Sequence, residues 1–219
     1  MEKMLKRFAI KFEKIDQKQN DIYYKAVRQI FADYPKNVAL PHVVLKVTVL
    51  NRLYNTGILD IYSMARHIYK LGTKKDLDTL LKKGEINAIN KIRTGHGIRR
   101  KNSKHDINEY SFATKYCHFS NPNWYPVYDS YVEKAIWYLQ ENKARYKIQD
   151  IFDPQKEYLS KPLDFRNIIN RIIQHFGFSH YQQIDRYQQI DRALWMYGDW
   201  LKKKELAEKE LSKFNNEDQ

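Results

Sequence analysis

The chain has few of the residues that build disulfides, metal clusters and membrane spans. It holds one cysteine, Cys117, which excludes an internal disulfide and any four-cysteine zinc or iron–sulfur site and is typical of a reducing compartment. The longest uncharged apolar run, residues 37–45, is interrupted by Pro41 and is too short to cross a bilayer. Residues 1–18 carry charges throughout, unlike a signal peptide. We therefore expect a cytoplasmic protein that has no membrane partner.

Several catalytic motifs are also missing. The seven histidines form neither an HxxxH nor an HExxH pair, so the sequence does not indicate a zinc enzyme. None of the motifs GxxxxGK[ST], GxGxxG and GxSxG occurs, and one cysteine among scattered histidines is poor evidence for a thiol nucleophile. We therefore expect no metal ion and no cofactor.

Positive charge and aromatic rings are abundant. The chain has 39 Lys and Arg residues against 26 Asp and Glu residues, which gives a formal net charge of +13. Such a charge attracts polyanions, meaning DNA, RNA or anionic lipid. There are 17 Tyr, 10 Phe and 4 Trp residues, and rings beside cations suit base stacking combined with phosphate contact. We expect most of these rings to lie in the core, because aromatic side chains bury large areas.

Apolar spacing predicts an all-α fold. Nearly every segment repeats its apolar residues at helical intervals, and Gly57 and Gly72 end two of the predicted helices. Residues 43–49 are β-branched enough for a strand, but their flanks favour a buried helix. The sequence YQQIDR occurs at 181–186 and again at 187–192. A repeat of six residues is offset by about 120° from whole turns of an α-helix, so the two copies face different sides of the helix. We therefore interpret the repeat as a small duplication without a function.

One carboxylate is placed where it can do chemistry. The segment Tyr110–Val132 predicts a helix, an Asn-Pro-Asn break, and a short apolar approach that delivers Asp129 to the start of the next helix. In one interpretation Asp129 is an ordinary N-cap. In the other it faces a groove, where the helix dipole favours its charged form and it can stabilise positive charge or position a water molecule. The two interpretations are compatible.

The same segment, YSFATKYCHFSNPNWYPVYDSYV, resembles the core of the helix-hairpin-helix base-excision DNA glycosylase superfamily. Members carry a P-V-D-[ST]-H-V-type motif whose Asp is catalytic, and the corresponding residues here are Pro126, Val127, Asp129, Ser130 and Val132, with Tyr128 inserted. Residues 45–58 resemble the first core helix of the family and its following turn, and residues 191–198 resemble the closing helix of short members. The resemblance extends over residues 37–198 and is specific around Asp129.

The resemblance implies two helical lobes around a DNA-binding cleft, one formed by residues 37–110 and the other by 1–36 with 111–219. The glycine-rich hairpin that grips a phosphate in this family should fall near residues 105–110, where there is no glycine. Gly95-His96-Gly97 could take its place only if about ten residues were inserted after it. The hairpin is thus degenerate. The basic run at residues 99–104 either supplies the phosphate contacts instead or is a solvated loop.

Roles for single residues follow from the resemblance. Asp129 would be catalytic, and the lyase lysine of bifunctional members would align with Tyr110 or Ser111, one turn before Lys115. The resemblance therefore implies a monofunctional glycosylase. The expected wedge residues are Asn51 and Tyr54, the expected stacking residues are Tyr116, Trp124, Tyr125 and Tyr128, and the expected DNA-backbone contacts are Arg99, Arg100, Lys101, Lys104 and Lys115.

The implied activity is excision of a base from double-stranded DNA by a monomeric enzyme that flips the nucleotide and leaves an abasic site. Members of the superfamily act on oxidised, alkylated, mismatched or deaminated bases. Some defence-associated members attack hypermodified bases of phage DNA, and a short chain with a degenerate hairpin is a candidate for that antiviral role. The alternatives are a non-catalytic helical DNA-binding protein, an RNA-binding protein, and a metal-dependent nuclease that uses Asp129 and Glu133.

Overall fold

A computed structural model describes residues 20–74, 76–146, 148, 158–178 and 186–217. Within these ranges the chain is helical, which confirms the predicted all-α class, and the one extended pairing is an isolated bridge between Arg99 and Asp106. Across the same residues, no helix combines the length and the apolar character that a membrane span requires.

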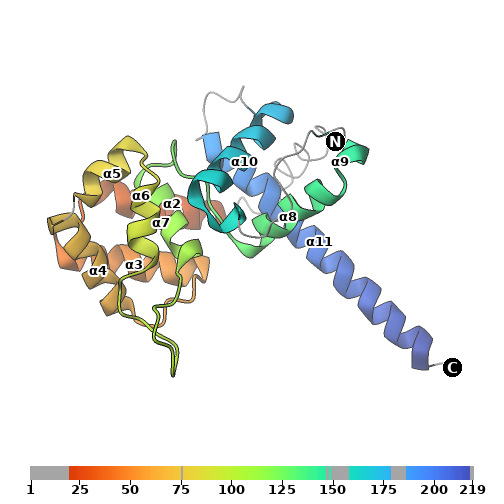
Figure 1. Cartoon of the computed structure of the whole chain (residues 1–219), viewed down its shortest axis with the longest axis horizontal. Helices are drawn as coiled ribbons and strands as arrows, with labels where there is room; N and C mark the ends of the chain where they lie inside the picture. The colour runs from red at the N-terminus through yellow and green to blue at the C-terminus, as the bar shows by residue number, and fades with distance from the viewer. Residues whose placement is uncertain (1–19, 75, 147, 149–157, 179–185, 218–219) are drawn as a thin grey trace.

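The helices follow one another along the chain, and a hairpin formed by residues 94–109 separates α6 from α7 (Figure 1). In chain order they are α2 Asn20–Asp33, α3 Leu40–Tyr54, α4 Ile61–Lys74, α5 Leu77–Lys83, α6 Asn87–Arg93, α7 Tyr110–Ser120, α8 Ser130–Glu141, α9 Lys143–Tyr146, η1 Tyr158–Ser160, α10 Pro162–His175 and α11 Arg186–Glu217.

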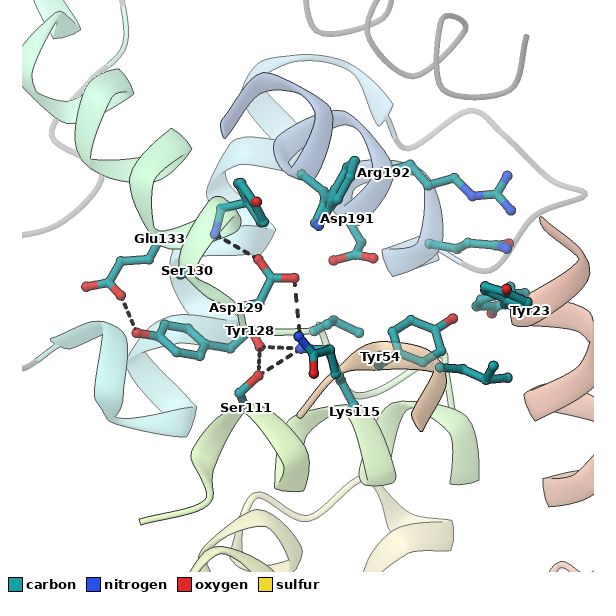
Figure 2. Close-up of a pocket in the computed structure, with 17 residues that line it drawn as sticks. Tyr23, Tyr54, Ser111, Lys115, Tyr128, Asp129, Ser130, Glu133, Asp191 and Arg192 are labelled. Carbon is teal, nitrogen blue, oxygen red and sulfur yellow. Dashed lines mark hydrogen bonds and ion pairs between the residues drawn. The ribbon is translucent and has the colours of Figure 1, made fainter. Parts of the chain in front are cut away.

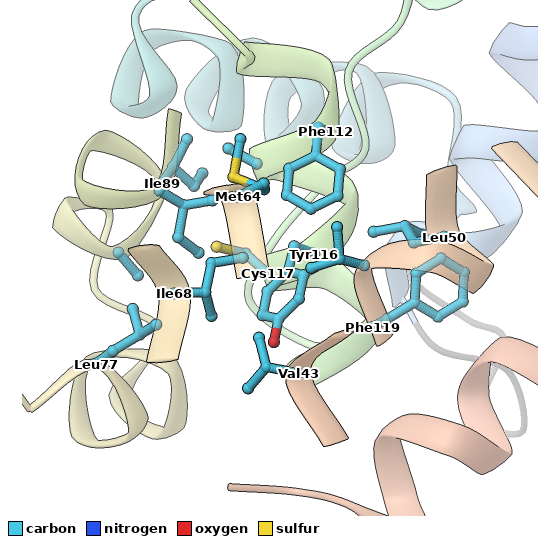
Figure 3. Packing of buried hydrophobic residues seen from close by; sticks show 14 of the residues in the cluster. Val43, Leu50, Met64, Ile68, Leu77, Ile89, Phe112, Tyr116, Cys117 and Phe119 are labelled. Carbon is cyan, nitrogen blue, oxygen red and sulfur yellow. The ribbon is translucent and has the colours of Figure 1, made fainter. Parts of the chain in front are cut away.

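The first hydrophobic cluster surrounds α7. Nearly all of this helix is buried, because apolar residues occur on every side of it, and α2 to α6 pack around it (Figure 3). The segment that could have been a strand lies in α3, which buries Val43, Val47 and Leu50 along one stripe. The interpretation of residues 43–49 as a buried helix is therefore confirmed.

The second hydrophobic cluster joins α8, α10 and α11. Val132 and Ile136 of α8 pack against Ile190 and Leu194 of α11, together with an isoleucine-rich face of α10. α11 approaches α8 closely at Gly198, where a Cβ atom would overlap the backbone of the first turn of α8. The long C-terminal half of α11 extends away from the rest of the molecule (Figure 1).

These clusters divide the chain differently from the expected lobes. The first cluster runs from Val27 to Tyr125 and takes in α2 and α7, both of which the expected boundaries placed in the other lobe. α2 belongs there because Phe31 packs edge-on against Tyr116 of α7, with ring centroids 5.0 Å apart. Tyr128 packs against both clusters and marks the place where they meet.

Candidate active site

A cavity of about 610 Å³ lies where the two clusters meet, and its size is that of a typical small-ligand pocket. Its walls come from α2, α3 and α7 of the first cluster, the connection that leads into α8, and the start of α11 (Figure 2). Helices that are distant from one another in the sequence therefore line the same cavity.

Asp129 projects into this cavity and also caps α8. Its backbone is extended, with φ −153° and ψ 176°, and its Oδ1 accepts hydrogen bonds from the N–H groups of Tyr131 at 3.0 Å and Val132 at 2.9 Å. Its Oδ2 lies 3.9 Å from Nζ of Lys115. Asp129 is thus both the N-cap of α8 and a residue that lines the cavity, so the two interpretations drawn from the sequence both describe its position.

Lys115 is buried beneath Asp129. Its ammonium group donates to Oγ of Ser111 at 2.8 Å and to the carbonyl oxygen of Tyr128 at 3.1 Å, in addition to facing Asp129. Burial lowers the pKa of Lys115, while the charges of Asp129 and Asp191 act in the opposite direction. With a side chain only 5% exposed, Lys115 does not lie with the surface cations, which corrects its expected role as a DNA-backbone contact.

Two tyrosines expected at the pocket do line it. Tyr54 reaches it from the end of α3, and burial followed by the charge of Asp191 raises the pKa of its hydroxyl well above the usual value. Tyr128 precedes Asp129, and its hydroxyl donates to Oε2 of Glu133 at 2.6 Å. Burial is the main cause that raises the pKa of Tyr128, so both hydroxyls remain neutral at ordinary pH.

Two other tyrosines expected to stack a base are core residues instead. Tyr116 is fully buried in α7 and its hydroxyl donates to Oδ1 of Asn37, while the hydroxyl of Tyr125 donates to the carbonyl oxygens of Leu80 and Glu85. Nearness to Asp129 in the sequence was misleading, because these rings point into the first cluster and away from the cavity.

Trp124 and Asn51 also lie away from the cavity walls. Trp124 is 49% exposed and packs against Gly84. Asn51 stabilises the turn after α3, since its Oδ1 accepts from Oγ1 of Thr56 at 2.8 Å and from N–H of Ile58 at 2.9 Å. Its amide is therefore committed to the fold, which corrects its expected role as a wedge.

The basic run lies on a hairpin that projects between α6 and α7 (Figure 1). Its four cations, Arg99, Arg100, Lys101 and Lys104, are exposed. The Gly95-His96-Gly97 turn begins this hairpin, and both glycines have positive φ, +83° and +82°. Residues 98–109 separate this turn from the start of α7.

The carboxylate of Asp106 occupies the glycine turn. The N–H of Gly97 donates to Oδ2 of Asp106 at 3.0 Å, and Nε of Arg99 lies 3.2 Å from Oδ1. The Gly97 hydrogen bond is the first cause that lowers the pKa of Asp106. In this conformation an internal carboxylate holds the amide that would otherwise be available to a phosphate.

Asp191 is the residue of the site that sequence reasoning missed. It lies on α11 in the second YQQIDR copy, which also supplies Gln188 and Arg192 to the cavity. Part of Asp191 remains accessible, but its Oδ1 is buried and has no hydrogen-bond partner among the residues that the structure describes. Burial, followed by the charge of Asp129, raises the pKa of Asp191 to about 8.

A signal for Asp191 was present in the sequence. Tyr187, Ile190, Leu194 and Tyr197 form an apolar stripe along α11, and Asp191 borders that stripe, where an acid is unusual. The repeat was interpreted as functionless because its copies differ in phase, yet the second copy lines the cavity. Residues 181–185 of the first copy lie outside the described residues.

The chemistry available at this site combines an anionic carboxylate, a second carboxyl group in a desolvated setting, a buried ammonium group and tyrosine rings. Among the residues described, no group of three or more His, Cys, Asp and Glu side chains is arranged to hold a metal ion. Glu133, the second acid of the nuclease alternative, has its carboxylate bound by the hydroxyl of Tyr128. The site is therefore suited to stabilising positive charge and to transferring protons.

A family model described as HI_0787_N, N-terminal domain, matches residues 2–124, more than half of the chain. A protein of Haemophilus influenzae strain Rd, described as "Uncharacterized protein", is 37% identical over 99 residues, which cover 45% of each chain. No solved structure matches. The family match ends near the last residue of the first cluster, so it includes Lys115 and Tyr54 but neither Asp129 nor Asp191.

Proposed function

The chain belongs to the HI_0787_N family, and we propose that it is a monofunctional DNA glycosylase that removes a damaged or modified base by hydrolysis of the N-glycosidic bond. The observation that carries this proposal is the setting of Asp129, a carboxylate held by two backbone N–H groups and a buried lysine at the wall of a tyrosine-lined cavity. Breaking a glycosidic bond creates positive charge on the sugar, and a fixed carboxylate stabilises that charge.

Asp129 is oriented before any substrate arrives. Its Oδ1 is fixed by the first turn of α8, which leaves Oδ2 on the side of Lys115 and the cavity. A group that is held in place needs no reorganisation during the reaction, and this is the main advantage of an enzyme site over water. Lys115 is thus a positioning residue whose ammonium group faces Oδ2 of Asp129.

The cavity walls suit an extruded base. Tyr54 lines the cavity from the first cluster, Tyr128 lines it from the place where the two clusters meet, and Trp195 adds a third aromatic ring from α11. A base that leaves the duplex is held by stacking against such rings. The exposed cations of the hairpin, Arg100 and Lys104 among them, would contact phosphates without regard to sequence.

The contacts of Lys115 favour hydrolysis over a lyase reaction. The ammonium group of Lys115 donates hydrogen bonds to Ser111 and to the carbonyl oxygen of Tyr128, and the carboxylate of Asp129 lies 3.9 Å away as an ion-pair partner. A lysine nucleophile would have to lose a proton and leave this cage, so water is the favoured nucleophile. Borohydride treatment during the reaction should yield no covalent enzyme–DNA adduct, whereas a trapped adduct at Lys115 would show that the enzyme is bifunctional.

The decisive experiment is a search for the released base. The protein is incubated, with a chelator present, with duplexes that contain oxidised, alkylated, mismatched or deaminated bases and with phage DNA that carries glucosylated hydroxymethylcytosine. Mass spectrometry then identifies any free base. Release in the presence of chelator would exclude the metal-dependent nuclease, and release from the phage DNA would indicate antiviral defence.

Asp129→Asn tests the role of the acid, because asparagine is an equally good N-cap and should preserve the fold. We expect DNA binding to persist and excision to fall by about 10²- to 10³-fold, the usual loss when one fixed electrostatic group is removed. Glu133→Gln is the matched control: it changes another carboxylate of the same cavity, one that is bound to Tyr128, and should keep most of the activity. Full activity in Asp129→Asn would refute the catalytic role of Asp129, whereas DNA binding by wild type without release of any base would favour a DNA-binding protein that is not an enzyme.

A further inference from the structure

Two carboxyl groups enter the cavity from different helices and in contrasting surroundings. Asp129 receives two backbone hydrogen bonds and faces Lys115, whereas Asp191 points in from α11 with its Oδ1 buried and unpartnered (Figure 2). Paired carboxyls whose environments differ in this way are the usual basis for dividing acid and base roles within one site.

The surroundings of Asp191 favour its protonated form. Loss of solvent is the first cause, and the negative charge of Asp129 is the second; together they outweigh the attraction of Lys115 and Arg192 and raise the pKa of Asp191 to about 8. The remaining titratable groups that line the cavity are Tyr23 and Tyr24 from α2, Tyr54 from α3, Tyr128, and Tyr131 and Glu133 from α8. At neutral pH Asp191 therefore carries a proton in a site where its neighbour Asp129 is charged.

Within the described part of the protein, Oδ1 of Asp191 is buried and makes no hydrogen bond. A buried polar group without a partner is unfavourable, so natural proteins retain one chiefly where a ligand completes it or where it acts in catalysis. An ordinary structural acid would instead be expected to bond a backbone amide, as Asp129 does.

We propose that Asp191 is the general acid of the site: from its buried position opposite Asp129, it protonates the departing base. This inference rests on the proposed glycosylase function and extends it. Asp129 would stabilise the sugar, and Asp191 would neutralise the leaving group, so the two acids act on the two ends of one bond.

The proton and electron transfers balance over the reaction. As the bond from C1′ to the base nitrogen breaks, its electron pair remains on the base, and the Asp191 hydroxyl transfers its proton to a nitrogen or oxygen of that base. The sugar becomes an oxocarbenium ion beside Asp129. Water then adds to C1′ and gives one proton to Asp129, and exchange with solvent returns Asp129 to its anionic form and Asp191 to its protonated form.

This role defines a substrate class. A neutral base leaves as a poorly stable anion unless it is protonated, so its release depends on a general acid. A base alkylated on a ring nitrogen already carries positive charge and leaves as a neutral molecule, so it needs no proton. Asp191 therefore makes neutral damaged or modified bases accessible to the enzyme, whereas release of cationic alkylated ones does not depend on it.

The test compares wild type, Asp191→Asn and Asp129→Asn on two duplexes, one with a neutral substrate base from the release screen and one with 7-methylguanine. Asp191→Asn should slow release of the neutral base by about 10²- to 10⁴-fold, the usual contribution of a general acid. It should slow 7-methylguanine release less than tenfold, while Asp129→Asn impairs both. The wild-type rate on the neutral base should fall above about pH 8, and Asp191→Asn should lose this alkaline decline.

Two controls keep the outcomes distinct. Asp199→Asn makes the same change on the same helix outside the cavity, where Asp199 pairs with Lys203, and it should leave both rates unchanged. Asp191→Glu should restore part of the lost rate if a proton donor is what the site requires. Equal slowing of both substrates by Asp191→Asn, or an unchanged alkaline decline, would overturn the general-acid role alone. Failure of wild type to release a base from any DNA would overturn both this role and the proposed function.

Discussion

At Asp191 the folded and unfolded states differ by one bound proton over a wide pH range. The ordinary pKa of this side chain is 3.8, and folding raises the pKa to about 8. Between these values the folded protein holds the extra proton, so its stability must fall as the pH rises. Below pH 4 both states are protonated, and above pH 8 neither is, so the effect is confined to that window.

This linkage predicts a stability difference that depends on pH. Asp191→Asn should gain stability relative to wild type as the pH rises from about 4 to about 8, by at most about 1.4 kcal/mol per pH unit, and the gap should stay constant at higher pH. Urea denaturation at intervals between pH 4 and pH 9 measures it. Asp199→Asn is the control, and a gap that did not change with pH would contradict the raised pKa.

Lys115 offers a second test at the residue scale, because its two possible roles differ in their response to salt. As a buried positioning residue it should matter to excision: Lys115→Gln should slow base release by about 10- to 100-fold, since it removes the cation that orients Asp129. The slope of log affinity for DNA against log salt should not change. A slope reduced by about 0.9 would show that Lys115 contacts a phosphate, as the sequence predicts. Lys101→Gln, on the exposed hairpin, is the positive control for such a change.

At the scale of helices, close approach at two glycines holds each cluster together. A Cβ atom at Gly198 would overlap the backbone of Tyr131 in α8, and one at Gly72 would overlap the carbonyl of Asn37 before α3. The first contact lies under the cavity wall that carries Asp191, whereas the second lies within the first cluster. Substitutions at the two glycines can therefore distinguish a general loss of stability from a change in the geometry of the site.

Both Gly198→Ala and Gly72→Ala should destabilise the protein by about 1–3 kcal/mol, because overlap with backbone outweighs the better helix propensity of alanine. Only Gly198→Ala should also disturb the site, since it pushes α11 away from α8 and separates the two carboxyl groups. Melting temperatures report the first effect, and the alkaline decline of the excision rate reports the second. An unaltered pH profile in Gly198→Ala would mean that α11 can shift without moving Asp191.

The helical elements were largely predictable from the sequence, whereas only part of the site was: Asp129, Tyr54 and Tyr128 line the cavity as expected, and other expected residues do not. The stripe of Val43, Val47 and Leu50 predicts α3, and the break before Asp129 predicts the start of α8, because both depend on local spacing. Tyr116 and Tyr125 are close to Asp129 in sequence but point into the core. Local patterns specify which face of a helix is buried, but not which distant helix covers it, and for that reason Asp191 was missed.

For the molecule as a whole, the net charge of +13 predicts DNA binding that weakens steeply with salt. Replacing Arg100, Lys101 and Lys104 by alanine should reduce the salt slope by up to about 2.7, at about 0.9 for each phosphate contact, without altering stability. Lys74, Lys82 and Lys83 are the matched control set, exposed cations on α4 and α5 whose removal lowers the charge equally. Equal effects from the two sets would indicate a diffuse attraction and no specific contact of the hairpin with DNA.

The cavity belongs to neither cluster alone. Lys115 and Tyr54 come from the part of the chain that the family model matches, and both carboxyl groups come from the part beyond it. A chain that kept residues 2–124 but carried a different second half would retain the buried ammonium group and the ring surface, yet it would lose both acids. A relative that shares only the N-terminal domain therefore does not necessarily share the proposed reaction. The same reaction could be assigned to it only if its own second half supplied two acids to the cavity.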